Sequence, residues 1–150
     1  MKKEWADWFI EYSNSKKWER IYKPTNPILK RQYDFLSVSR NEVPFDIELD
    51  DYIRKFIGDH EYSNNGYVLI RYGVGDYIGE HTDSYNNSKV TYVCELQSSE
   101  CGTGLTIDGI SVNEVCYTTK VKHEVKPIKA GTRISLTMFG RNTKLSSGLI

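Results

Sequence analysis

The pattern of hydrophobic and polar residues changes once along the chain, near residue 66. Before that point, two segments show helical spacing. The first is an aromatic stripe with charged residues between its members, formed by Trp5, Trp8, Phe9 and Tyr12. The second, "PFDIELDDYIRKFIG", carries an apolar face, with Asp46 as the expected N-cap and Gly58 as the expected C-terminal stop. Both segments are predicted to be helices that pack against the rest of the protein.

After residue 66, short β-branched and aromatic runs are separated by glycine, asparagine and aspartate. They are "YVLIRY", "KVTYVCEL", "GLTID", "ISVNEVCY", "KVKHEV" and "TRISLTMF". Asp108 and Gly109 between two of these runs form a two-residue hairpin signal. An earlier run, "QYDFLSVSR", places Tyr33, Phe35 and Ser37 at alternate positions, as in a half-buried strand. We predict N-terminal helices backing an antiparallel sandwich or barrel.

Composition narrows the classes of protein. Twenty lysines and arginines balance twenty aspartates and glutamates, so no overall charge draws the chain to nucleic acid or to a membrane surface. No apolar run resembles a membrane span or a signal peptide, which favours a cytoplasmic protein. Three cysteines without a CxxC pair predict neither a disulfide framework nor a cysteine zinc site. At 150 residues we expect one domain, with a helical buttress at about 1–62, a β core at about 66–140 and a short polar tail.

Histidine and aspartate residues carry the first chemical signal. The stretch "YGVGDYIGEHTD" ends with His81 and Asp83, which point the same way in an extended segment because side chains alternate across a strand. An imidazole and a carboxylate that share one face of an octahedron with a third ligand favour iron(II). His60 is expected in a solvated turn. His123 lies in an alternating run that can pair beside His81, so it is the better third ligand.

An arginine completes the pattern. Arg133, Ser135 and Thr137 share one face of the run "TRISLTMF", which begins after a glycine turn at Gly131. A buried guanidinium is costly unless an anion meets it, and its planar fork matches a carboxylate. A dicarboxylate ligand would therefore fit between the metal and Arg133.

These residues, in this order, resemble the Fe(II)- and 2-oxoglutarate-dependent dioxygenases from about Tyr67 to Phe139. In that superfamily an HxD…H triad holds iron, and the following arginine binds the distal carboxylate of 2-oxoglutarate. "YGVGDYIGEHTD" and "HEVKPIKAGTRISLTMF" look most like the prolyl 4-hydroxylase type. The resemblance implies a mainly β protein, a double-stranded β-helix (jelly roll, cupin-like) with N-terminal supporting helices.

The resemblance also implies a role for each residue. The implied iron ligands and catalytic residues are His81, Asp83 and His123. The residues implied to bind or support the cosubstrate are Arg133, Tyr72 and Ser135. The implied reaction uses Fe(II), 2-oxoglutarate and O2, with ascorbate as a candidate reductant, and hydroxylates a C–H bond with release of succinate and CO2. Its implied substrate is a peptidyl proline, another protein side chain or a small molecule.

Three other functions stay open. An alkylation-repair nucleic-acid demethylase has a similar tyrosine-glycine-HxD approach, but such relatives carry a second arginine six positions after the first, where this chain has Phe139, and Arg141 is displaced by two. The balanced charge also disfavours a nucleic-acid substrate. A cupin-like sensor would keep the metal and 2-oxoglutarate without turnover. A zinc hydrolase would need an acidic base, and strand alternation turns Glu80 away from His81.

Some details depend on strand orientation. On the run "VTYVCEL", either Tyr92 or Cys94 is expected to face the cosubstrate, because relatives often place a tyrosine there. Tyr77 and Tyr85 are candidates for the substrate side of the site. The segment "SYNNS" after Asp83 leaves little chain for a lid over the metal.

Overall fold

The computed structural model describes residues 1–58, 60–62, 66–83 and 89–142 of the chain. Within these ranges the strands outnumber the helices, so the protein is mainly β, as predicted. In chain order the elements are α1 (Lys3–Asn14), β1 (Glu19–Lys23), β2 (Arg31–Ser39), η1 (Arg40–Glu42), α2 (Asp46–Ile57), β3 (His60–Tyr62), β4 (Gly66–Tyr72), β5 (Tyr77–His81), β6 (Val90–Gln97), β7 (Leu105–Ile107), β8 (Ile110–Val112), β9 (Glu114–Thr118), β10 (His123–Val125) and β11 (Arg133–Asn142).

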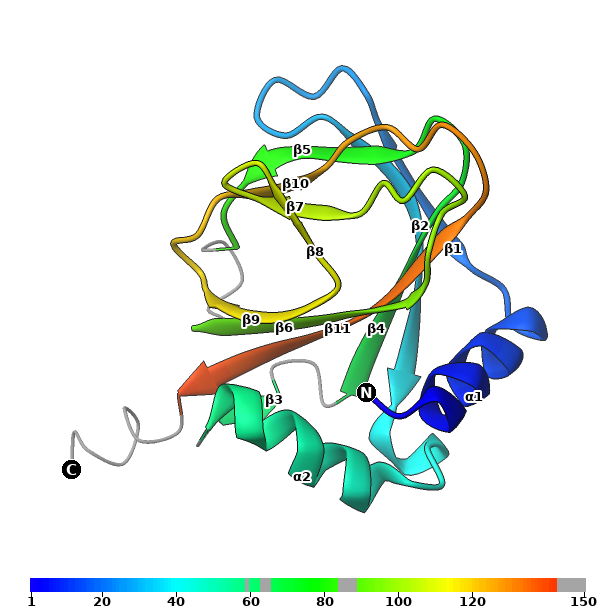
Figure 1. Ribbon diagram of the computed structural model, residues 1–150, viewed down its shortest axis with the longest axis vertical. Coiled ribbons are helices and arrows are strands. Elements are labelled where there is room, and N and C mark those ends of the chain that lie inside the picture. Colours follow the sequence, from blue (N-terminus) through cyan, green and yellow to red (C-terminus); the bar gives the residue numbers. More distant parts are fainter. Residues whose placement is uncertain (59, 63–65, 84–88, 143–150) are drawn as a thin grey trace.

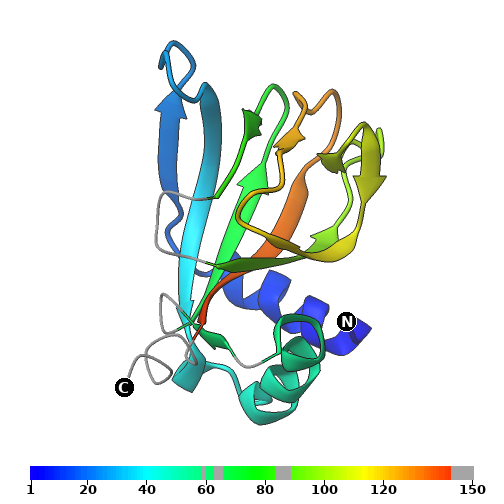
Figure 2. The same ribbon diagram turned by 90° about the vertical axis from the view of Figure 1, so that its left-hand side faces the viewer.

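The helices α1 and α2 lie on one side of the barrel of strands (Figures 1 and 2). On α1, Trp5 and Phe9 are buried, as the aromatic spacing predicts, and Trp5 stacks on Phe45 with ring centroids 5.6 Å apart. Burying each of these side chains stabilises the fold by about 2 kcal/mol. The buried face of α2 consists of Leu49, Ile53 and Ile57. No helix in the described ranges is long and apolar enough to cross a membrane.

The predicted N-cap of α2 is wrong by one position. The helix begins at Asp46, Phe45 occupies the cap position, and the cap makes no side-chain hydrogen bond. The Asp46 carboxylate instead accepts a hydrogen bond of 2.6 Å from the Tyr67 hydroxyl and pairs with the Arg40 guanidinium at 2.9 Å. It therefore joins the helix to the sheet. Gly58 ends the helix as predicted, with a φ of 66° that favours glycine.

The strands form one antiparallel sheet that curves until it is nearly closed (Figure 1). The order of neighbours is β8-β7-β10-β5-β2-β4-β11-β6-β9, while β1 pairs with β2 and β3 pairs with β11. In Figure 1, β5, β10 and β7 form the upper wall, and β6, β9 and β11 form the lower wall. This arrangement confirms the predicted double-stranded β-helix with N-terminal supporting helices.

The first 62 residues contribute strands as well as helices. β2 lies between β4 and β5 in the sheet, and its alternation is as predicted. Its outer face packs Leu36 and Val38 against the cluster beneath the helices. β3 pairs with the end of β11, so His60 lies in a strand and not in the predicted solvated turn. The β2 residues that face the interior of the barrel are Tyr33, Phe35 and Ser37.

Two predicted turns are present at the ends of strands. Asp108 and Gly109 have φ of 51° and 76° and join the paired strands β7 and β8, so the two-residue hairpin is confirmed. Gly131 has a φ of 78° immediately before β11. This turn leads into β11, which begins with Arg133 and lies between β4 and β6.

Candidate metal centre and anion pocket

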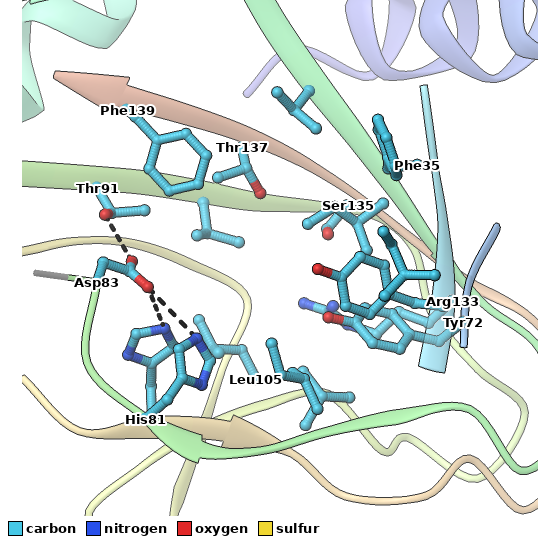
Figure 3. Close-up of a pocket in the computed structure, with 18 of the residues that line it drawn as sticks. Phe35, Tyr72, His81, Asp83, Thr91, Leu105, Arg133, Ser135, Thr137 and Phe139 are labelled. Atoms are coloured by element: carbon cyan, nitrogen blue, oxygen red, sulfur yellow. Dashed lines mark hydrogen bonds and ion pairs between the residues drawn. The ribbon is translucent and has the colours of Figure 1, made fainter. Parts of the chain in front are cut away.

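Three side chains from two neighbouring strands meet inside the barrel (Figure 3). His81 ends β5, Asp83 follows two residues later, and His123 begins β10, directly opposite His81 in the ladder. Asp83 Oδ1 lies 3.3 Å from His81 Nε2 and 3.2 Å from His123 Nε2. One candidate ligand atom from each residue lies within 4.8 Å of the others. The structure thus brings together the three residues that the sequence singled out, in an arrangement that can hold a metal ion.

Backbone carbonyls orient both imidazole rings. His81 Nδ1 lies 2.8 Å from the Gly79 carbonyl oxygen, and His123 Nδ1 lies 3.0 Å from the Val121 carbonyl oxygen. A ring nitrogen that donates to a carbonyl leaves the other ring nitrogen as a lone-pair donor. Both Nε2 atoms are therefore available as ligand atoms, and both face Asp83.

Asp83 lies in this cluster as a carboxylate, although it is only 3% exposed. Burial opposes its ionisation, but hydrogen bonds with His123 and His81 outweigh burial and hold the pKa of the Asp83 carboxyl well below its usual range. Burial likewise disfavours the charged form of His123, yet contact with Asp83 raises the pKa of this imidazole. A divalent cation would displace a proton on His123 Nε2, which faces Asp83 Oδ1, and would bind all three side chains.

A cavity of about 580 Å³ extends from this cluster through the barrel. In Figure 3 the His81 and Asp83 side chains lie at one end, and Arg133 and Tyr72 lie at the other. Apart from tyrosines, the only ionisable side chains among the described residues that line the cavity are those of the cluster and Arg133. The remaining lining consists of apolar side chains and hydroxyls. Positive charge at the far end is therefore concentrated on one guanidinium.

Arg133 is 1% exposed and lies directly opposite Tyr72 in the β4–β11 ladder. Its Nε donates a hydrogen bond of 2.9 Å to Glu95 Oε1. Its Nη2 atom is buried and has no hydrogen-bond partner among the described residues. A buried N–H without an acceptor costs about 1–3 kcal/mol. This atom marks a position for an acceptor that the described chain does not supply, which is what the carboxylate of a ligand would provide.

Tyr72 lies beside this guanidinium. The Arg133 guanidinium carbon lies 5.7 Å from the centroid of the Tyr72 ring. Burial raises the pKa of Tyr72 well above its usual range, and the nearby charge of Arg133 offsets this only in part. The Tyr72 hydroxyl is therefore a neutral donor at physiological pH. Ser135 is buried and lines the same wall of the cavity.

On β6, the residues that face the site differ from those predicted. Tyr92 and Cys94 both belong to the hydrophobic core between the sheet and the helices, so neither faces the cavity. Thr91 and Val93 line the cavity instead, and Glu95 on the same face reaches Arg133. The sequence does indicate this orientation, because the polar residues Thr91 and Glu95 alternate with Tyr92 and Cys94 along the strand.

The glycine-containing loop before β5 is a structural turn at the other end of the strand from His81. Gly75 has a φ of 85°, and its amide donates to the Ile128 carbonyl. Asp76 accepts hydrogen bonds from the Gly73 amide at 2.9 Å and from both terminal nitrogens of Arg20 at 2.7 and 2.8 Å. Asp76 thus fixes the start of the strand that carries His81, a role that sequence reasoning missed.

Other residues considered from the sequence lie elsewhere. Phe139 lines the cavity, at the position where the alkylation-repair hypothesis expects a second arginine. Glu80 is exposed, as strand alternation predicts. Tyr85 and the rest of "SYNNS" lie outside the described residues. Four further residues considered from the sequence lie within the described ranges but do not line the cavity: His60, Tyr77, Glu80 and Arg141.

Neither a protein-family model nor a curated protein matches this sequence. Its fold is nevertheless similar to solved prolyl hydroxylases. A Pseudomonas putida prolyl-4-hydroxylase aligns with a TM-score of 0.69 and 18% identity, over 94% of this chain and 88% of that one. A viral collagen prolyl hydroxylase from Paramecium bursaria Chlorella virus-1, solved as a 2OG complex, aligns with a TM-score of 0.67 and 15% identity, over 95% and 92% of the two chains.

A third similar structure contains a peptide. It is a Trichoplax adhaerens prolyl hydroxylase in complex with a fragment of the hypoxia inducible factor oxygen degradation domain. It aligns with a TM-score of 0.55 and 14% identity, over 97% of this chain and 92% of that one. These comparisons confirm, at the level of the fold, the predicted resemblance to 2-oxoglutarate oxygenases of the prolyl hydroxylase type.

Proposed function

We propose that this protein is an Fe(II)- and 2-oxoglutarate-dependent oxygenase that hydroxylates a C–H bond. One observation carries the proposal: a single cavity joins a two-histidine, one-carboxylate cluster to a buried arginine whose Nη2 has no partner among the described residues. That donor set is the one that non-haem iron(II) oxygenases use. The unpartnered nitrogen is suited to an anionic end of a cosubstrate.

Each residue has a proposed task. The proposed iron ligands are His81, Asp83 and His123. Arg133 would donate to the distal carboxylate of 2-oxoglutarate, Tyr72 would donate its neutral hydroxyl nearby, and Ser135 would support Arg133. Bound Fe(II), 2-oxoglutarate and O2 supply the C–H oxidation, with succinate and CO2 as coproducts. Ascorbate is the proposed reductant that keeps the iron ferrous. The chain itself orients these groups and excludes water around them.

The volume of the cavity leaves room for part of a substrate. 2-Oxoglutarate has ten non-hydrogen atoms and occupies less than about 300 Å³, even if each atom is given the volume of a water molecule. Roughly half of the 580 Å³ cavity is then left for another molecule. The side chains that line the cavity include Phe35, Val68 and Phe139, which carry no charge. The buried part of the substrate is therefore uncharged, as a proline ring or another aliphatic group is.

A protein or peptide is the proposed source of that group. The peptide bound to the similar Trichoplax enzyme supports this choice. The proposed location is the cytoplasm, because the free cysteines Cys94, Cys101 and Cys116 suit a reducing compartment. We further propose that the chain acts as one domain, because β2 from its first third completes the sheet that carries the site.

Anaerobic titration tests the proposal. Adding Fe(II) and then 2-oxoglutarate should produce the visible charge-transfer band of the chelated cosubstrate. His81→Ala and Asp83→Ala should abolish iron binding, whereas Arg133→Ala should mainly weaken 2-oxoglutarate binding. His60→Ala is the matched control, because it removes the histidine that does not line the cavity. An unchanged band in Asp83→Ala would remove the proposed ligand set.

Turnover separates an enzyme from a sensor. Succinate release in air should rise when the correct peptide from a proline-containing library is added. Tight binding of both cofactors with no succinate from any candidate substrate would instead assign a cupin-like sensor. The zinc hydrolase and nucleic-acid demethylase alternatives receive less support, because Glu80 is exposed and Phe139 lies in the cavity at the place of the second arginine.

A further inference from the structure

The arginine of the cavity is already paired with a carboxylate. Arg133 Nε donates to Glu95 Oε1 at 2.9 Å, and the two side chains are 1% and 9% exposed. Ser98 Oγ donates to the other oxygen of Glu95 at 2.7 Å. A Cβ atom on Gly104 would lie 3.1 Å from Glu95 Oε1 and 3.6 Å from Arg133 Nε, so glycine leaves room for the pair there. Glu95 is therefore fixed on the Nε edge of the guanidinium.

This contact leaves another edge of the guanidinium for a ligand. A guanidinium has five N–H donors in a rigid plane, so fixing Nε also fixes the direction of the terminal nitrogens. Arg133 lines the cavity, whereas Glu95 does not. The Nη2 atom, buried and without a partner among the described residues, belongs to the terminal edge. Glu95 thus holds the guanidinium in place without occupying the position of a ligand.

The ionised side chains that line the cavity, together with Glu95, which pairs with one of them, balance a cosubstrate with one negative charge. A divalent metal ion would bring two positive charges, and Arg133 brings one. Asp83 and Glu95 each bring one negative charge, and histidine ligands are neutral. One net positive charge remains. 2-Oxoglutarate brings two negative charges, so its distal carboxylate leaves one buried negative charge in excess, which is unfavourable.

We propose that Glu95 sets the cosubstrate specificity of this site: it weakens the preference for a distal carboxylate, so that 2-oxo acids with a neutral, hydrogen-bond-accepting distal group bind as well as 2-oxoglutarate. The inference rests on the proposed function and refines it. If Glu95 served only to hold Arg133 in place, removing Glu95 would weaken the binding of every ligand that contacts the guanidinium. Under our proposal, removing its charge strengthens the binding of 2-oxoglutarate.

Calorimetry with two ligands tests this inference. The protein is loaded with Mn(II), a redox-inert substitute for iron, and titrated with 2-oxoglutarate and with its 5-methyl ester, which keeps the 2-oxo acid but has a neutral distal acceptor. We expect dissociation constants within about threefold of each other for the native protein, because the charge balance offsets the ionic hydrogen bond. A preference for 2-oxoglutarate above about a hundredfold in the native protein would overturn the inference without any variant.

Glu95→Gln keeps the shape of the side chain and an acceptor for Nε while it removes the charge. We expect this variant to bind 2-oxoglutarate at least about tenfold more tightly, and the ester with less than about a threefold change. Glu61→Gln, an exposed position on β3, is the matched control and should leave both constants unchanged. A ratio of the two constants that stays the same in Glu95→Gln within about twofold would overturn the inference.

The remaining outcomes separate this inference from the proposed function. If no 2-oxo acid binds to the metal-loaded native protein or to Glu95→Gln, the oxygenase assignment fails, and the inference fails with it. If 2-oxoglutarate binds to the Glu95→Gln variant but not to the native protein, the repulsion between Glu95 and a distal carboxylate is supported. That result would also exclude 2-oxoglutarate as the cosubstrate of the native chain. If both ligands bind and the variant changes nothing, only the inference fails.

Discussion

Thr91 Oγ1 donates a hydrogen bond of 2.7 Å to Asp83 Oδ2, while Asp83 Oδ1 faces the Nε2 atoms of both histidines. Thr91 is fully buried on β6, across the barrel from the strands that carry the histidines. The two oxygens of one carboxylate thus have separate tasks. One is anchored by the sheet, and the other is directed at the candidate metal position.

Thr91→Val should weaken metal binding without unfolding the protein. Valine has nearly the shape of threonine but no hydroxyl, so Asp83 Oδ2 loses its anchor and the carboxylate can rotate. Loss of such an orienting hydrogen bond lowers metal affinity by about 10- to 100-fold. Calorimetric titration with Mn(II) measures the change. Thr137→Val is the control, because Thr137 is a buried threonine that lines the same cavity. Equal losses in the two variants would argue against an orienting role for Thr91.

Tyr72→Phe should weaken 2-oxo acid binding while metal affinity stays constant. The substitution keeps the ring beside Arg133 and removes the neutral hydroxyl donor. A single hydrogen bond contributes about 0.5–1.5 kcal/mol, so the dissociation constant should rise by roughly 3- to 10-fold. Titration of the Mn(II)-loaded variant with 2-oxoglutarate checks this. If the dissociation constants for metal and for ligand rise together, Tyr72 acts on the fold of the site and not on the ligand.

Asp76→Asn should destabilise the protein at neutral pH and not in acid. Burial opposes ionisation of Asp76, but hydrogen bonds from Arg20, the Gly73 amide and Gln32 lower the pKa of this carboxyl below its usual value. A depressed pKa in the folded state stabilises the fold above the unfolded pKa of about 3.9, and this contribution is lost as the pH falls through the folded value. At pH 7 we expect a loss of about 2 kcal/mol, the usual scale for hydrogen bonds to a charged group.

Thermal unfolding at several pH values measures this effect. The difference between Asp76→Asn and the native protein should shrink below pH 4 and disappear below the folded pKa of Asp76. Asp7→Asn serves as the control, since Asp7 pairs with Lys3 on the surface and exposed pairs contribute little. A difference that persisted in strong acid would mean that the Asp76 charge is not its cause.

Gly66→Ala should destabilise the sheet through a steric clash. A Cβ atom on Gly66 would overlap the Val38 carbonyl oxygen of the neighbouring strand β2. Backbone cannot move aside cheaply, so we expect a loss of about 2–3 kcal/mol in the free energy of unfolding. At Gly73 the nearest atom to an added Cβ is Asp76 Oδ2 at 3.6 Å, an ordinary contact. Denaturant unfolding should therefore show a much smaller change for Gly73→Ala.

The sequence alone predicts which way a side chain points where the alternation of residue types distinguishes the two faces of a strand. His81 and Asp83 share one face of an extended segment, and the ladder that sets His123 opposite His81 follows from pairing two such segments. The orientation of the β6 side chains is harder to predict, because both faces of this strand are buried. Tyr92 and Cys94 pack toward the helices, while Thr91 faces the cavity. Alternation between two buried faces does not say which one is the interior of the barrel.

The roles of buried charged residues are the other feature that the local sequence does not predict. The sequence predicts Asp46 as a helix cap and assigns no role to Glu95, because each residue finds its partner far away along the chain. Asp46 bonds to Tyr67, and Glu95 bonds to Arg133, 38 positions away. A carboxylate in a sequence is expected at the surface unless its partner is known. Such pairs become visible only when the fold brings distant strands together.

β4 and β5 are consecutive in the chain and joined by a short turn, yet β2 lies between them in the sheet. Because β2 separates them, these two strands do not form a hairpin with each other. Both pair instead with a strand from much earlier in the chain. Folding routes that depend on such distant pairings are slow, on the order of milliseconds to seconds. The path through the sheet from β5, which carries His81, to β6, whose Thr91 anchors Asp83, therefore runs through β2. Metal binding in a refolding experiment would report the completion of the barrel and not its nucleation.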